Sequence, residues 1–102
     1  MSILHTVNKS PFEKNSLRSC IEHALEGSAV LLIEDGVYGA IKNTAIAETV
    51  KKAMENIAVY ALKSDIDARG INQDHLIDKI ELVDYSGFVK LATEHDKVQS
   101  WL

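Results

Sequence analysis

The chain has 102 residues, of which 46% are hydrophobic, and its 15 acidic and 11 basic residues give a formal net charge of −4. This length suits a single domain spanning residues 1–102 and leaves no room for a second core. No run of about 18 apolar residues is present, which excludes a membrane-spanning helix, and no Lys/Arg cluster offers a surface for a nucleic-acid backbone. We expect no signal peptide, because no basic segment followed by an apolar one opens the sequence, and the single cysteine favours the cytoplasm.

The first part of the chain predicts a strand followed by a helix. Residues 3–7 alternate weakly and suit a short strand. A helix is expected over residues 16–26, with Asn15 or Ser16 capping its start and Gly27 taking the left-handed position at its end. Its apolar residues recur on one helical face: Leu17, Cys20, Ile21, Ala24 and Leu25.

The middle of the chain repeats this alternation. Residues 29–33 form a continuous apolar run between turn residues, which suits a strand covered on both faces. Residues 37–41 are ambiguous, because their central glycine weakens both helix and strand. A second helix opens at Asn43 or Thr44 and runs to about residue 55.

The remaining segments predict two more strands and a final helix, so the order of elements indicates an α/β layered fold. Buried strands favour a mostly parallel sheet with helices on both faces. No repeat, low-complexity tract or linker interrupts the chain. The expected segments are a strand at 57–62, a helical turn at 65–69, a loop with some helical turn at 71–78, a strand at 80–83, a helix at 87–95, and a short tail at 98–102.

Cys20 is the only cysteine, so it forms no internal disulfide and completes no cysteine zinc site. One interpretation is a core thiol, since free cysteine is among the most buried residue types. The other is a candidate sulfur acceptor, whose thiolate would attack a persulfide and would need access and a lowered pKa. His23, three residues further along the helix, lies close enough to favour such a thiolate.

Other motifs give little support for a cofactor or a metal. The four histidines form no H-x-x-x-H pair, and no glycine-rich phosphate loop follows a strand. The sequence therefore predicts neither a cofactor nor a metal. Glu34-Asp35-Gly36 follows the second strand and could place acids at the sheet edge, but Asp-Gly more commonly makes a turn.

Trp101 is a large aromatic residue next to the end of the sequence, where a small domain has difficulty burying it. Because tryptophan is enriched at interface hot spots, Trp101 is a candidate interface residue. The alternative is that the tail docks on its own domain.

Several segments, in order and at matching length, resemble the DsrH/TusB family of small subunits in bacterial sulfur-relay complexes. The opening LHTVNKSPF and the segment LLIEDGV are similar to the first strand region, the second strand and its acidic turn in that family. The resemblance continues along the chain through residues 59–62, Asp65, 68–70, 83–89 and 99–101.

The resemblance implies a DsrE-like α/β fold and a heterohexamer with DsrE/TusD-like and DsrF/TusC-like sister subunits. It implies that the principal sulfur-carrying cysteine belongs to a sister subunit and that persulfide sulfur passes to a DsrC/TusE-like carrier protein. The chain is then an accessory subunit of a sulfurtransferase complex, with no direct contact to nucleic acid or membrane. Its status as an enzyme in its own right stays open.

Cys20 in the first helix, together with both chain ends, resembles the Dsr branch more than the Tus branch. We therefore expect a role in cytoplasmic sulfur oxidation. The alternative is the Tus-type relay, which serves 2-thiolation of the tRNA wobble uridine. Two further alternatives are a purely structural interaction subunit and an independent flavodoxin-like enzyme, and the missing phosphate loop makes the enzyme the weakest.

Overall fold

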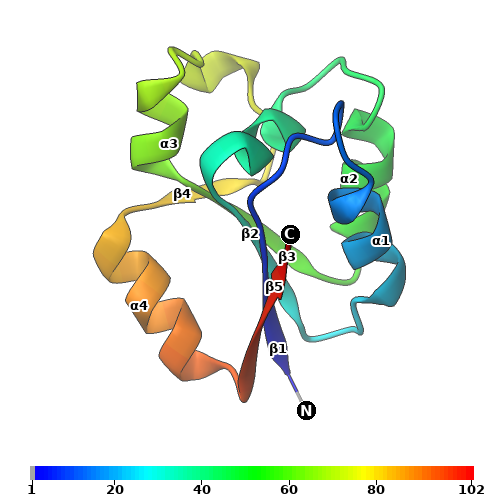
Figure 1. Cartoon of the computed structure of the whole chain (residues 1–102), viewed down its shortest axis with the longest axis vertical. Helices are drawn as coiled ribbons and strands as arrows, with labels where there is room; N and C mark the ends of the chain where they lie inside the picture. Colours follow the sequence, from blue (N-terminus) through cyan, green and yellow to red (C-terminus); the bar gives the residue numbers. More distant parts are fainter. Residues whose placement is uncertain (1) are drawn as a thin grey trace.

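A single parallel sheet organises the chain (Figure 1). The computed structural model describes residues 2–102. The five strands lie in the order β4-β3-β2-β1-β5, and every neighbouring pair is parallel. The strands are β1 (Ile3–Val7), β2 (Ala29–Leu32), β3 (Ala58–Leu62), β4 (Glu81–Val83) and β5 (Lys97–Trp101).

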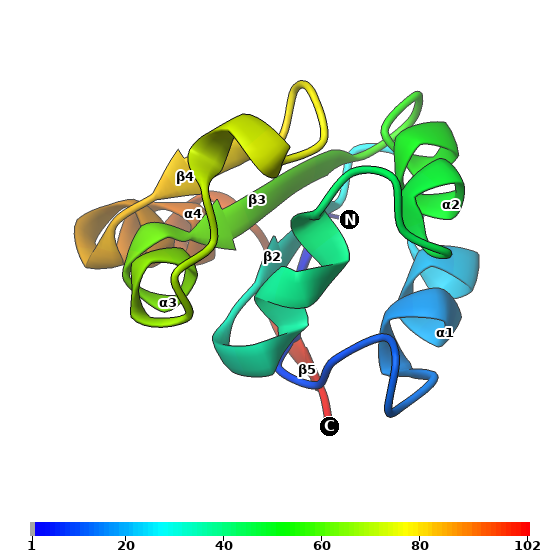
Figure 2. The same ribbon diagram turned by 90° about the horizontal axis from the view of Figure 1, so that it is seen from above.

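Helical segments connect the strands and cover both faces of the sheet (Figure 2). A strand order that moves steadily from β1 to β4 places the first connections on one face, because parallel crossovers are right-handed. The return from β4 to β5 then places α4 on the opposite face. The helical segments are α1 (Ser16–His23), η1 (Glu34–Ala40), α2 (Ala47–Ala53), α3 (Lys63–Ala68), η2 (Gln73–His75) and α4 (Tyr85–Glu94).

Two apolar clusters hold these layers together. The larger lies between one face of the sheet and the helical segments α1, η1, α2 and α3 that cover it. It includes Leu17, Val50 and Ile66. The smaller packs Leu91 of α4 against Leu4 and Leu31. All four residues of β2 are buried, as expected for a central strand with helices on both faces. The predicted α/β class, with a parallel sheet between helices, is confirmed.

The first helix ends earlier than the sequence suggests. It stops at His23, because Ala24 is already extended and the chain then turns through Gly27 at φ +89°. Leu25 therefore does not belong to the inner stripe: 67% of its surface is exposed. The glycine does take the left-handed position, but it stands beyond an extended connection, so the predicted end at residue 26 is wrong.

The helix expected to open at residues 43–44 also begins later, at Ala47. Asn43 has a φ of +65°, and Thr44 donates its hydroxyl hydrogen bond back to the Ile41 carbonyl at 3.2 Å. Both residues belong to the turn that precedes the helix. The ambiguous segment 37–41 is largely the 3₁₀ helix η1, in which Gly39 is buried against the Leu17 side chain.

The tail is the largest departure from the sequence-based account. Residues 97–101 form β5, which pairs with β1 along its whole length, from Ile3 opposite Lys97 to Val7 opposite Trp101. No sequence alternation marks this strand, since four of its five residues are exposed at the sheet edge. In the described part of the chain, residues 2–102, no helix has the length and apolarity needed to cross a membrane.

Candidate functional site

Cys20 lies in the middle of α1 and points into the larger apolar cluster. Its exposed fraction is 0%, and its neighbours in the cluster include Leu17 and Val37. Burial raises the pKa of the Cys20 thiol to about 12, because desolvation penalises the thiolate. In this conformation the sulfur has neither the access nor the ionisation that attack on a persulfide requires.

His23 does not provide the activation that its spacing from Cys20 suggests. Its Nδ1 donates a hydrogen bond to the Ser19 carbonyl at 2.7 Å, and the residue is exposed. Burial is the single cause of the raised Cys20 pKa, with no contribution from the imidazole. The His23 ring instead faces the indole of Trp101, with the ring centroids 5.9 Å apart.

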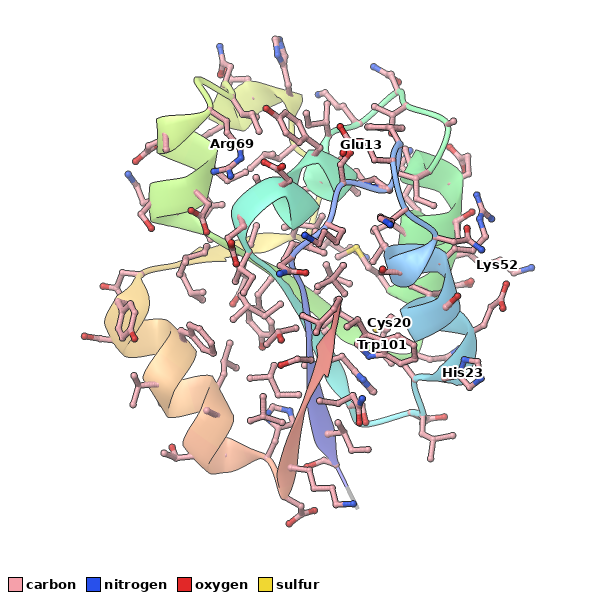
Figure 3. All side chains as sticks on the ribbon, in the orientation of Figure 1. Glu13, Cys20, His23, Lys52, Arg69 and Trp101 are labelled. Atoms are coloured by element: carbon pink, nitrogen blue, oxygen red, sulfur yellow. The ribbon has the colours of Figure 1, made fainter. Side chains whose placement is uncertain are left out.

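Trp101 docks on its own domain through β5. Its indole Nε1–H donates a hydrogen bond of 3.0 Å to Nδ1 of His5 on β1, and the indole packs against the larger apolar cluster. Figure 3 shows Trp101 on the side of the sheet that α1 covers, next to His23. The indole stays partly exposed, so a further role as an interface residue remains a prediction.

His5 is the hydrogen-bond partner of Trp101, and the sequence alone did not predict this contact. The residue is only 4% exposed, and burial lowers the pKa of its imidazole. Ninety-six positions separate His5 and Trp101 in the chain, so no local spacing links them. Only the pairing of β1 with β5 brings the two rings together.

The acidic turn after β2 is bound into structure. Arg69, which directly follows α3, contacts the Asp35 carboxylate at 2.9 Å, and an Asp65 oxygen accepts a hydrogen bond from the Glu34 backbone N–H at 2.7 Å. Gly36 passes so close to β1 that an added Cβ would lie 2.1 Å from the Val7 carbonyl oxygen. These contacts tie η1 to α3 and β1, which agrees with a turn rather than a catalytic acid pair. Sequence reasoning did not foresee Arg69, since 34 positions separate it from Asp35.

Within residues 2–102, no three His, Cys, Asp or Glu side chains come together in a way that could hold a metal ion. The candidate residues Cys20 and Trp101 lie on the α1 side of the sheet, where Trp101 also contacts His5. Their arrangement is that of a packed core with one buried imidazole.

Comparison with known proteins gives the family. A family model described as "DsrH like protein" matches residues 9–98. "Protein TusB" of Enterobacter sp. (strain 638) is 39% identical, and the alignment covers 97% of this chain and 100% of that protein. This chain belongs to the DsrH/TusB family. The DsrH/TusB chain is also 33% identical to "Protein TusB" of Escherichia coli (strain K12 / DH10B), again over 97% and 100% of the two chains.

Solved structures support the fold of this DsrH/TusB chain. The ychN protein from E. coli superposes with a TM-score of 0.85 at 19% identity, over 99% of both chains. MTH1491 from Methanobacterium thermoautotrophicum, a protein of unknown function, superposes with a TM-score of 0.76 at 14% identity, over 96% of both chains. At these identities the likeness establishes the fold alone, and it agrees with the DsrE-like fold expected from the sequence.

Proposed function

We propose that this DsrH/TusB chain is an accessory subunit of a Tus-type sulfur relay that serves 2-thiolation of the tRNA wobble uridine. The observation that carries the proposal is full-length similarity, at up to 39% identity, to proteins named TusB. The chain would act in a heterohexamer with TusD-like and TusC-like sister subunits and hand sulfur to a TusE-like carrier. The net charge of −4 and the lack of a basic cluster fit a subunit that meets partner proteins rather than RNA.

In this proposal Cys20 is a core residue and the reactive thiol belongs to a sister subunit. The burial of the Cys20 side chain and its pKa of about 12 support this assignment. For Cys20 itself to accept sulfur, α1 or β5 would first have to move and expose the thiol. That step stays a prediction, and an added sulfur mass on Cys20 after exposure to a loaded donor would support it.

The sulfur-oxidation branch, which the sequence alone favoured, has less support than the Tus branch. Three relatives that each align over 97% of this chain are named TusB, including one from Photorhabdus laumondii at 34% identity. The Dsr assignment depended largely on a cysteine in the first helix. A buried, un-ionised thiol at that position gives no reason to assign a sulfur-oxidising role.

The test is to delete the gene in its own host and measure 2-thiouridine in total tRNA by mass spectrometry. We expect the 2-thio modification to be strongly reduced and to return when the full chain is supplied on a plasmid. Oxidation of reduced sulfur compounds by the same strain is measured in parallel. Unchanged thiolation together with impaired sulfur oxidation would reject the Tus branch in favour of the Dsr branch.

A further inference from the structure

The hydrogen bond between Trp101 and His5 fixes the state of a buried imidazole. Because the indole Nε1–H can only donate, Nδ1 of His5 must accept and cannot carry a proton. Neutral His5 therefore holds its proton on Nε2. That Nε2 atom is buried and has no hydrogen-bond partner within residues 2–102.

This geometry is incompatible with a charged His5. An imidazolium carries N–H groups on both nitrogens, so its Nδ1–H would point at the indole N–H and the hydrogen bond would be lost. The buried Nε2–H offers no acceptor to stabilise the positive charge. Protonation of His5 in place would therefore set two donors against each other in a buried site.

The other titratable groups around His5 do not offset the cost of placing a positive charge on its ring. The titratable or charged groups on the surrounding elements are Arg18, Cys20, Glu22 and His23 of α1 and Lys97 of β5, and β2 carries none; of these, Arg18, Glu22, His23 and Lys97 are exposed to solvent. Burial is the only cause of the lowered His5 pKa, so none of them offsets the cost of a charge there. His23 touches the same indole, which makes it the natural control.

Loss of the hydrogen bond between Trp101 and His5 would weaken the attachment of β5 to the sheet. Trp101 is the residue of β5 that reaches the core, whereas Lys97 to Ser100 are exposed at the sheet edge. The remaining side-chain contacts of the strand and the final residue are two exposed or half-exposed hydrogen bonds, from Thr6 to Ser100 and from Ser16 to the Leu102 carbonyl. Loss of the Trp101 anchor would leave β5 held mainly by its backbone pairing with β1.

We propose that neutral His5 and Trp101 form a pH-sensitive latch, and that protonation of His5 releases the C-terminal strand β5 from the sheet edge and uncovers the α1 side of β1. The folded protein prefers neutral His5, whereas the released strand lets the imidazole titrate near its ordinary pKa of about 6.5. The latch is therefore intact above about pH 6.5 and weakens as the pH falls below that value.

The test is made on the full chain by NMR and hydrogen exchange. In the wild type at pH 7.5, the ¹⁵N shifts of His5 should show the neutral Nε2–H tautomer. Between pH 7.5 and pH 5.5 the protection factors of the β5 amides should fall by up to about tenfold, while those of the central strands β2 and β3 change less. The indole Nε1–H signal of Trp101, the only tryptophan in the chain, should lose its docked shift in parallel.

Two variants separate His5 from other titrating groups. In His5→Asn the amide oxygen replaces Nδ1 as an acceptor and does not titrate, so β5 should stay protected at pH 5.5. In His23→Gln the pH-dependent loss should persist. An Nδ1–H tautomer in the wild type, β5 protection that does not change with pH, or a loss that persists in His5→Asn would each overturn the proposal. The tautomer measurement needs no variant, so it decides the matter even if His5→Asn fails to fold.

Discussion

Burial determines what the side chains of Cys20 and His5 can do chemically. Cysteine and histidine often act in catalysis, but these two residues lie in the interior. For Cys20, a pKa of about 12 leaves roughly one thiol in ten thousand ionised at pH 8. For His5, burial and the indole hydrogen bond hold the neutral form.

The Cys20 thiol should resist modification while the protein is folded. We expect thiol reagents at pH 8 to label Cys20 only on unfolding, so that the labelling rate rises with denaturant along the unfolding curve. Cys20→Ala should cost about 1 kcal/mol of unfolding free energy. Cys20→Ser should cost more, about 1–3 kcal/mol, because it buries a hydroxyl among apolar side chains. Rapid, complete labelling in native buffer would show that the thiol is accessible.

Gly36 should be intolerant of any side chain. Its missing Cβ leaves room for the Val7 carbonyl, which a methyl group would meet at 2.1 Å. We expect Gly36→Ala to lower the free energy of unfolding by about 1–3 kcal/mol or more, as overpacking against backbone does. Gly70→Ala is the control, since that position has open space and only a left-handed φ of +65°. Equal losses in urea unfolding would argue against a steric origin.

At the level of elements, β5 depends on one anchor residue. We expect Trp101→Ala to cost about 3 kcal/mol, near the lower end for truncating a core aromatic residue, because the indole is partly exposed. Val98→Ala on the same strand removes an exposed side chain (49% exposed) and should change stability by less than about 0.5 kcal/mol. Urea unfolding of both variants measures the difference, and similar costs would contradict the anchoring role of Trp101.

The strand β5 could not be predicted from the sequence, whereas the inner strands could. The inner strands β2 and β3 are predictable, because helices on both faces of the sheet give these strands continuously apolar sequences. An edge strand such as β5 carries no such pattern, and its partner lies more than ninety positions away in the chain. Helix ends were misplaced where a turn residue such as Asn43 adopts a left-handed backbone that composition does not reveal.

The candidate site was only partly predictable for a related reason. The position of Cys20 on the inner face of α1 follows from helical spacing, and its burial was one of the two interpretations that the sequence left open. The contacts of His5 with Trp101 and of Arg69 with Asp35 depend on tertiary packing between distant segments. No local sequence motif indicates that these residues form pairs.

At the scale of the whole molecule, the chain is expected to work as part of an assembly. Native mass spectrometry of the tagged full chain from its own host should give a mass that fits two copies each of three small subunits. The physical reason is that Cys20, the only cysteine in the sequence, is buried with a raised pKa, so the proposed relay assigns the reactive thiol to a sister subunit. A free monomer or a homodimer would count against the relay complex.

The proposed role is tested most directly by the 2-thiouridine content of tRNA in a host strain that lacks the gene and carries Cys20→Ala on a plasmid. We expect the variant to restore 2-thiouridine to the level reached with the wild-type chain, because a thiol packed in the core is not accessible to a persulfide donor. Restoration by the wild type but not by a folded Cys20→Ala would contradict this and assign the sulfur-transfer step to Cys20.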